Sequence, residues 1–147
     1  MSEYELRRIP GDGRLEDAFA VRRDVFIDEQ GVSEAEEMDG KDDEAIHYVA
    51  YVSGEPPYPI GTARLRRPEP DVAKFERVAV REPYRGEGRG RQLMHAIESE
   101  AREQGCSHAL LHAQTAVEEF YAALGYETTS DVFDEAGIPH VTMEKRL

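Results

Sequence analysis

The chain has 147 residues, 39% of them hydrophobic, and carries 31 acidic against 18 basic side chains, for a formal net charge of -13. A chain of this length buries one sizeable core, so we expect a single domain over residues 1–147. A surface that is negative almost everywhere repels polyphosphates, which argues against nucleic acid or an anionic membrane as the main partner. Lysine occurs only at positions 41, 74 and 145. This acidic, lysine-poor balance is typical of proteins from salt-saturated cytoplasm, with an ordinary acidic protein as the alternative.

The only cysteine, Cys106, excludes an internal disulfide framework and a site built from several thiolates. We interpret it as a small buried side chain. The opening segment MSEYELRRIP lacks the apolar stretch of a signal peptide, and no window approaches the roughly 18 apolar residues of a membrane span. These features predict a cytoplasmic protein.

In the N-terminal half, alternating segments predict strands, and apolar residues at spacings of three and four predict a helix. The predicted strands are 4–9, 45–52 and 59–67, and the predicted helix is 15–30. The charge run SEAEEMDGKDDEA, residues 33–45, predicts a short helix followed by a loop, and we interpret its acidic side chains as a solvated face.

The C-terminal half continues the alternation of strands and helices, which is typical of a mixed α/β sheet. Glycines at 105 and 125 are natural ends for its two helices. The predicted elements are a strand at 71–80, a helix at 89–104, a strand at 107–113, a short helix at 116–124 and a closing hairpin of 126–133 with 139–147.

The segment REPYRGEGRGRQLM, residues 81–94, concentrates arginine and glycine where the pattern becomes helical. A strand that leads through glycines into a helix is suited to bind an oxyanion, because backbone N–H groups can approach the ligand and those of the first helical turn lack internal partners. Arg85, Arg89 and Arg91 would add positive charge there. The alternative, a glycine-rich turn with solvated arginines, is equally compatible with the loop taken alone.

Two common phosphate-binding motifs do not fit this segment. A P-loop requires lysine and then serine or threonine after its last glycine, but Arg91 follows Gly90. The dinucleotide fingerprint requires glycine at the first, third and sixth places. Gly86 and Gly88 satisfy the first two, but the sixth residue is Arg91.

Arg85-x-x-Gly88-x-Gly90 matches the Q/R-x-x-G-x-G/A signature of the GNAT superfamily of N-acetyltransferases. The segment FERVAVREPYRGEGRG is similar to the whole fourth strand, turn and helix start of that family, and VEEFYAALGY resembles its downstream F-Y-x-x-x-G-Y/F segment. RRDVFIDEQGV, AIHYVAY and AGIPH are similar to the small bacterial and archaeal branch known as YjcF/ElaA-like. The resemblance extends from about residue 20 to about residue 145.

The resemblance implies a single-domain α/β fold of the α+β kind. Its mixed central sheet would have about six to seven strands, splayed between the fourth and the fifth, and about four flanking helices. It also implies transfer of an acetyl group from acetyl-CoA to a primary amine by direct transfer through a ternary complex, without a metal. Small amines, aminosugars, antibiotics and protein amino termini are all acceptors in the superfamily, and the sequence does not select among them. Dimers are common in the family, which leaves a homodimer open.

The resemblance places the diphosphate of acetyl-CoA on the loop and its pantetheine arm beside the preceding strand. Gln114 stands where many relatives carry asparagine, so a hydrogen bond from an amide to the arm is retained with altered geometry. The implied cofactor-binding residues are Val78, Val80, Arg85, Gly86, Gly88, Arg89, Gly90, Arg91 and Gln114.

Two residues occupy positions that are catalytic in the family. Glu76 matches its glutamate base, acting directly or through water, with an ion-paired carboxylate beside Arg77 as the alternative. Strand alternation places Glu76 and Val78 on one face, and a β-bulge in this strand would change that. Tyr121 matches a general acid for the departing thiolate, with an aromatic core residue beside Phe120 as the alternative.

The acceptor side is assigned from the segments that resemble the YjcF/ElaA-like branch. His47 and His140 fall in two of them, and we expect both to face the acceptor pocket together with Glu29 and Gln30. For each histidine, a hydrogen-bonded structural side chain is the alternative.

The histidine pattern does not predict a metal site. His108 and His112 share strand parity, but they would lie about 13 Å apart at the rise of a strand, too far for one ordinary metal ion.

Two other functions stay open. The first is a non-catalytic acyl-CoA-binding module, which needs the loop but not Glu76 or Tyr121. The second is a generic α/β interaction domain, which predicts no binding of coenzyme A.

Overall fold

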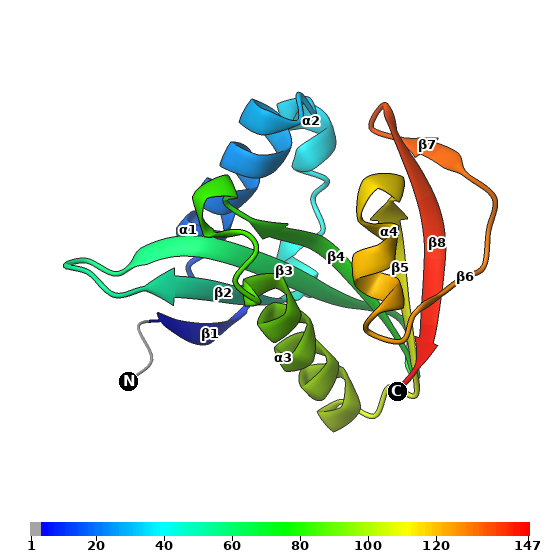
Figure 1. Ribbon diagram of the computed structural model, residues 1–147. Coiled ribbons are helices and arrows are strands. Elements are labelled where there is room, and N and C mark those ends of the chain that lie inside the picture. The colour runs from blue at the N-terminus through cyan, green and yellow to red at the C-terminus, as the bar shows by residue number, and fades with distance from the viewer. Residues whose placement is uncertain (1–3) are drawn as a thin grey trace.

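The computed structural model describes residues 4–147, which form one mixed eight-stranded sheet with helices on both faces (Figure 1). The strand order is β1-β2-β3-β4-β5-β8-β6, and β7 pairs with β8. The strands are β1 (Tyr4–Pro10), β2 (Ile46–Val52), β3 (Tyr58–Glu69), β4 (Val72–Val80), β5 (His108–Gln114), β6 (Glu127–Thr128), β7 (Phe133–Glu135) and β8 (Ile138–Arg146).

The helices follow the predicted order with shorter pieces. The predicted helix 15–30 consists of α1 (Glu16–Arg22) continued by a π-helix, η1 (Arg23–Glu29). The spacing of apolar residues does not distinguish an α-helix from such a π-helical segment. The other helices are α2 (Glu34–Glu37), η2 (Asp42–Glu44), η3 (Glu82–Tyr84), α3 (Arg89–Glu103), η4 (Thr115–Val117) and α4 (Glu118–Ala122).

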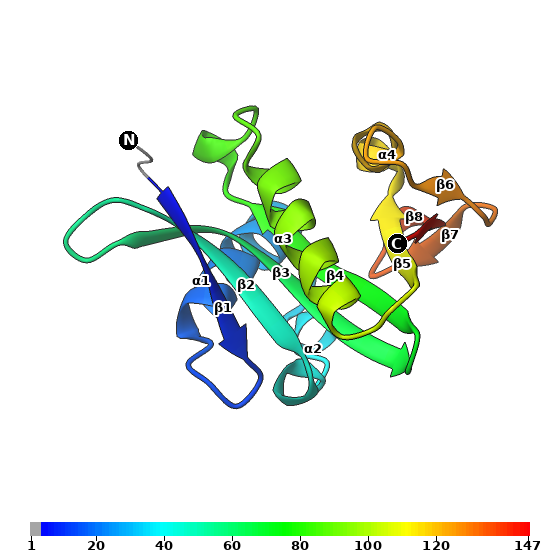
Figure 2. The same cartoon turned by 90° about the horizontal axis from the view of Figure 1, so that it is seen from below.

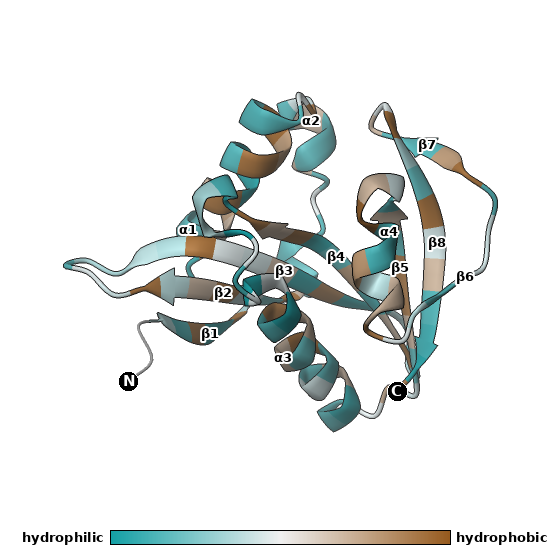
Figure 3. Ribbon diagram, viewed as in Figure 1, coloured by the Kyte–Doolittle hydropathy of each residue, from teal (hydrophilic) through white to brown (hydrophobic). Residues whose placement is uncertain are grey.

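The helices pack on the two faces of the sheet through separate apolar clusters. On one face α3 packs through Leu93 and Ile97 against a cluster that includes Phe75 of β4. On the other face Val21 of α1 and Val25 of η1 cover Ala79. Figure 2 shows α3 and α1 on opposite sides of the sheet, and Figure 3 shows apolar residues gathered along the central strands. Cys106 is buried and free, as predicted.

The sheet opens between its fourth and fifth strands, as predicted. β4 and β5 run parallel, and their register extends only from Val72–His108 to Phe75–Leu111. Beyond that pair the strands diverge, and Figure 1 shows the arm formed by β5 and β8 separating from β4. The backbone groups of β4 after Phe75 therefore lack a partner strand on this side.

A β-bulge in β4 reverses the faces of its side chains. Arg64 pairs with Glu76 but Thr62 pairs with Ala79, so β4 carries one extra residue in this interval. Arg77 there has a φ of 54°, an uncommon conformation for a residue with a side chain. Val78 and Val80 consequently pack toward the α3 cluster, whereas Ala79 contacts α1. Glu76 and Val78 thus lie on opposite faces, the outcome that a bulge was expected to produce.

No helix within residues 4–147 is long and apolar enough to cross a membrane.

Candidate active site

A cavity of about 840 Å³ lies where β4 and β5 diverge. On the α3 side its lining includes the loop 85–91, Val80 and Tyr121. On the opposite face it is lined by residues of η1 and α2 and by side chains of β5 and β8. The cavity therefore connects the two faces of the sheet through the gap between the strands.

The glycine-rich loop presents free backbone donors to this cavity. Gly86 and Gly88 both have a φ of 82°, which a residue with a side chain adopts only at a cost. The amide of Arg85 donates to Glu82, but within residues 4–147 none of the N–H groups from Gly86 to Arg91 donates to a backbone oxygen. The loop and the first turn of α3 are therefore open to an anion.

Gly90 also sets the spacing of the helices at this end of the cavity. A Cβ atom at Gly90 would lie 3.2 Å from the Phe120 ring, so the glycine lets the start of α3 approach α4 closely.

The loop arginines are arranged in different ways. Arg85 donates to both carboxylate oxygens of Glu29, at 2.7 and 2.6 Å, and to the carbonyl oxygen of Val80. Arg89 stacks over the Tyr4 ring with 3.8 Å between its Cζ and the ring centroid. Arg91 makes no ion pair within the described residues, so its guanidinium is available to a ligand.

Glu76 lines the cavity but is bound by cations on its own face of the sheet. Its carboxylate accepts hydrogen bonds from Arg64 and Arg66, and Lys74 lies 3.4 Å away. Burial by itself raises the pKa of Glu76, but the hydrogen bond from Arg66 and the three positive charges outweigh it and lower the pKa to about 2. The arrangement is the ion-paired alternative, with partners other than Arg77, and it disfavours Glu76 as a direct base.

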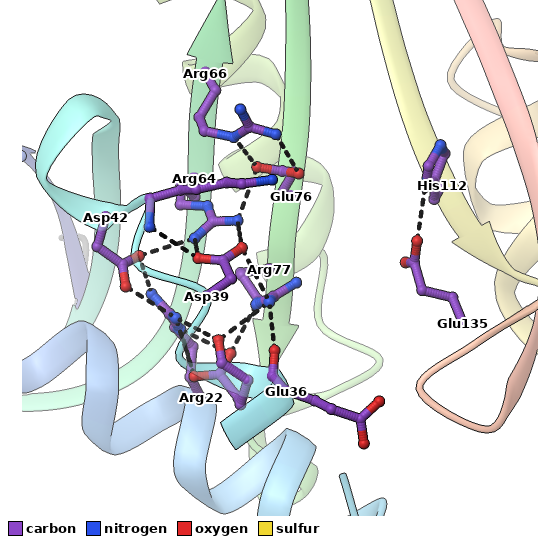
Figure 4. Close-up of polar contacts among 12 residues, drawn as sticks. Arg22, Glu36, Asp39, Asp42, Arg64, Arg66, Glu76, Arg77, His112 and Glu135 are labelled. Atoms are coloured by element: carbon purple, nitrogen blue, oxygen red, sulfur yellow. Dashed lines mark hydrogen bonds and ion pairs between the residues drawn. The ribbon is translucent and has the colours of Figure 1, made fainter. Parts of the chain in front are cut away.

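Glu76 belongs to a larger buried network, shown in Figure 4. Arg64 donates to Asp39 and Asp42 as well as to Glu76. Arg22 donates to Asp42 and to Glu37. The interpretation of 33–45 as a solvated face is therefore wrong for Glu37 and Asp42, which are buried against arginines from α1 and β3.

Tyr121 belongs to the core and also faces the cavity, so its position is compatible with both interpretations considered for it. Its ring packs edge-on against Phe120 and Tyr126 within the core, and it also lines the cavity. Its hydroxyl makes no hydrogen bond within the described residues. Burial raises the pKa of Tyr121, so the hydroxyl keeps its proton near neutral pH and can donate it.

The residues predicted for the acceptor side separate into two groups. Gln30 and His140 line the cavity, and Gln114 closes one side by donating to Gln30 at 2.8 Å. The placement of His47 was wrong, because it is fully buried beside the arginine network and its Nε2 lies 2.9 Å from the Asp42 carbonyl oxygen. Glu29 does not line the cavity itself but binds Arg85, which does.

His112 and Glu135 also line the cavity, and sequence reasoning gave them no role. The strand parity of His112 was readable from the sequence, but its partner on β7 depends on the closing hairpin. Within residues 4–147, no group of three or more histidine, cysteine or carboxylate side chains is arranged to hold a metal ion.

The sequence matches the family described as acetyltransferase (GNAT) domain over residues 15–147. This chain belongs to the GNAT family. The GNAT domain is 39% identical over 145 residues to the uncharacterised protein YyaT of Bacillus subtilis, covering 97% of this chain and 95% of YyaT. It is 41% identical over 133 residues to the N-acetyltransferase YjcF of the same organism, whose function is also uncharacterised, covering 90% and 92%. The resemblance to the YjcF/ElaA-like branch is thus confirmed.

Solved structures agree with the assignment. A candidate N-acetyltransferase from Lactobacillus plantarum superposes on the GNAT domain with a TM-score of 0.89 at 35% identity, covering 99% of each chain. Escherichia coli ElaA gives a TM-score of 0.84 at 24% identity, covering 97% of this chain and 99% of ElaA. A GNAT family acetyltransferase from Elizabethkingia anophelis with acetyl-CoA bound gives 0.75 at 13% identity over the full length of both chains. The last two, at lower identity, establish the shared fold.

Proposed function

We propose that this GNAT domain transfers an acetyl group from acetyl-CoA to a primary amine while both substrates occupy the cavity between β4 and β5. One observation carries the proposal. A single cavity extends from the unpaired amides of 86–91 on the α3 side to the space on the opposite face of the sheet that η1, α2, β5 and β8 line. The relative from Elizabethkingia anophelis, which has this fold, binds acetyl-CoA. An anion site and an amine site connected through a sheet are the arrangement that direct transfer needs.

Backbone groups of the loop and of β4 would bind different parts of acetyl-CoA in this transfer. The amides of 86–91 and the start of α3 would hold the diphosphate. The bulge turns Val78 and Val80 toward the α3 side, where the backbone of β4 can bond the pantetheine arm as an added strand would. Backbone N–H groups of β4 beyond Phe75 have no partner on β5 and would stabilise the oxyanion, an effect worth a few kcal/mol in the transition state.

The proposal is tested by calorimetry with acetyl-CoA and by a continuous thiol-release assay with a panel of primary amines. We expect binding of acetyl-CoA and release of coenzyme A with at least one amine. Binding without release for any amine would favour the non-catalytic acyl-CoA-binding module. Absence of binding would favour a generic interaction domain. We further propose that the protein acts in the cytoplasm, where acetyl-CoA is available.

Tyr121→Phe is expected to lower kcat about tenfold without changing the Kd for acetyl-CoA. The hydroxyl would protonate the departing thiolate, and the loss stays below the usual 10²–10⁴ for general acid catalysis because a thiolate leaves readily. Tyr126→Phe is the matched control: Tyr126 is a neighbouring core tyrosine whose hydroxyl donates to Glu98, and it does not line the cavity. We expect the control to lose stability and keep its kcat, and equal kcat values for all three proteins would refute the role of Tyr121.

Glu29→Gln is expected to tighten acetyl-CoA binding by up to about fivefold. The substitution weakens the bidentate pair that holds Arg85 and removes a negative charge near the loop, and an exposed pair of this kind is worth about 0.2–1 kcal/mol. Asp28→Asn, which changes an adjacent acid that makes no ion pair within residues 4–147, controls for net charge. Equal affinities in calorimetry of the two variants would contradict a specific role for the contact between Glu29 and Arg85.

A further inference from the structure

Acetyl transfer to an amine requires a group that removes a proton, because primary amines are protonated near neutral pH and only the neutral form attacks a thioester. Of the carboxylates that line the cavity on the side of the arginine network, those of Glu37, Asp39 and Glu76 accept hydrogen bonds from arginines, whereas that of Glu36 accepts one from the Ser33 hydroxyl. A lowered pKa makes such a carboxylate a weak proton acceptor at neutral pH. The arginine-bound carboxylates are therefore poorly suited to be the base, which directs the search to the opposite wall of the cavity.

His112 stands at the vertex where the two arms of the sheet separate. It follows Leu111, which is paired with Phe75 in the last parallel pair of β4 and β5. Leu111 and Ala113 point into the core shared with α3, so strand alternation turns His112 to the other face. Its side chain is 27% exposed and lines the cavity. It lies on the wall opposite Glu76 (Figure 4).

Glu135 fixes the tautomer of His112. The Nδ1 atom of His112 lies 2.9 Å from Oε1 of Glu135, and an ionised carboxylate only accepts hydrogen bonds. Nδ1 therefore carries the proton, and the lone pair of the neutral ring is on Nε2. The ring also packs edge-on against Phe133, with the centroids 5.1 Å apart. Within the described residues Nε2 makes no hydrogen bond, which leaves it free for a ligand.

His140 is less suited to the same task. Its Nδ1 donates to the Ile138 carbonyl at 2.7 Å, and its Nε2 faces Glu135 at 3.7 Å. Its side chain is only 8% exposed. The hydrogen bond from His112, with the charges of His140 and Lys74, outweighs burial and lowers the pKa of Glu135, so this carboxylate stays ionised beside both rings.

We propose that His112 is the catalytic base for the acceptor amine and that Glu135 is its positioning residue, an inference that rests on the proposed acetyl transfer. Nε2 of His112 takes one proton from the ammonium group, and the neutral amine attacks the thioester carbon. As the C–S bond breaks, the departing sulfur takes the proton of the Tyr121 hydroxyl, and the second proton of the nitrogen passes to the tyrosinate. The imidazolium then returns its proton to solvent. The acceptor therefore enters from the face that carries α1 and α2, between Glu76 and His112.

The decisive variant is His112→Asn, whose amide nitrogen can still donate to Glu135 while the acceptor atom Nε2 is lost. We expect kcat to fall about 100-fold, the usual scale for a general base, with an unchanged Kd for acetyl-CoA by calorimetry. The acidic limb of the pH–rate profile should disappear, and an amine of lower basicity should restore part of the rate. Glu135→Gln should keep the hydrogen bond and move the acidic limb to lower pH, because the imidazolium loses its stabilising charge.

The same strand offers a matched control. His108 also pairs with a carboxylate, Glu144, at 2.6 Å, and its side chain shares the parity of His112 but lies outside the cavity lining. His108→Asn should leave kcat and the acidic limb unchanged. The other charged or titratable groups that line the cavity near His112, namely Lys74, Glu76 and His140, are present in every variant, so the difference between the two histidine variants isolates Nε2.

Two outcomes would overturn the inference, and they are distinguishable. If the wild type releases coenzyme A with an amine and His112→Asn does so at the same rate with the same acidic limb, the role of His112 fails and the proposed function stands. If the wild type binds acetyl-CoA but acetylates no amine, both fail together. Circular dichroism of each variant shows whether a lost rate reflects lost folding.

Discussion

Replacing Arg64 by methionine is expected to lower the free energy of unfolding by about 3–5 kcal/mol at pH 7. The Arg64 side chain is fully buried and donates to Asp39, Asp42 and Glu76 at 2.8–3.0 Å. Methionine fills a similar space but leaves these carboxylates short of a positive charge in a poorly hydrated interior. An uncompensated buried charge costs more than the pair contributed, which is why the expected loss is large.

The loss of unfolding free energy in this variant should decrease as the pH falls. Burial opposes ionisation of Glu76, but its cations hold the pKa at about 2, well below the usual range of a glutamate. A lowered folded-state pKa stabilises the fold above the unfolded-state pKa, and this stabilisation is lost as pH falls from about 5 toward 2. The pKa of Asp39 is also lowered: the hydrogen bond and charge of Arg64 overcome its burial. The deficit of the variant should therefore be greatest near pH 7 and shrink in acid.

Urea unfolding at pH 7, 5 and 3 measures this dependence. Arg23→Met is the control, because Arg23 pairs with Glu34 on the surface, where both side chains are more than half exposed. Such a pair contributes about 0–1 kcal/mol. A deficit for Arg64→Met no larger than that of the control, or one that grows in acid, would contradict the view that the network is held by Arg64.

Most of the helices and strands that the sequence predicted correctly are those that follow from local residue patterns. Apolar alternation located the main strands, and the glycine-rich segment located the junction of β4 and α3 because its requirements are confined to a few adjacent residues. The opening of the sheet between its fourth and fifth strands followed from the family resemblance, whereas the end of their pairing at Phe75 is known only from the structure, since spacing alone does not specify where two strands stop pairing. Tyr121 and Gln114 were found in the same way, and both line the cavity.

The network and the second wall of the site depend on contacts between distant segments. Arg22 binds Asp42 across 20 residues, and Arg64 binds Asp39 across 25. Two acids of a run that resembles a solvated face, Glu37 and Asp42, are therefore buried. Strand parity predicts which face His112 takes, but not that the closing hairpin brings Glu135 to it across 23 residues. The sequence likewise could not exclude His47 from the acceptor pocket, because its burial depends on its neighbours in the arginine network.

Gly88→Asp is expected to weaken acetyl-CoA binding by a factor on the order of 10²–10³ while the protein stays folded. Gly88 has a φ of 82° at the start of α3, and a Cβ atom there would meet no atom of the described part of the chain within 4 Å. Aspartate tolerates this backbone conformation better than most residues, so the folded state should survive at a modest cost. Its carboxylate would compete for the free amides and repel the diphosphate. Two unit charges about 4 Å apart near a protein surface interact by up to about 4 kcal/mol.

Two controls separate charge from backbone strain. Gly88→Asn has nearly the same shape without the charge, so its Kd should rise far less than that of Gly88→Asp. Gly105→Asp introduces the same side chain at the opposite end of α3, where φ is 91° and the space is also open. It should lose comparable stability and bind acetyl-CoA normally in calorimetry. If the two Gly88 variants bind equally well, or if Gly105→Asp is impaired to the same extent as Gly88→Asp, the diphosphate does not rest on the amides of this loop, and the placement of both substrates in the cavity fails with it.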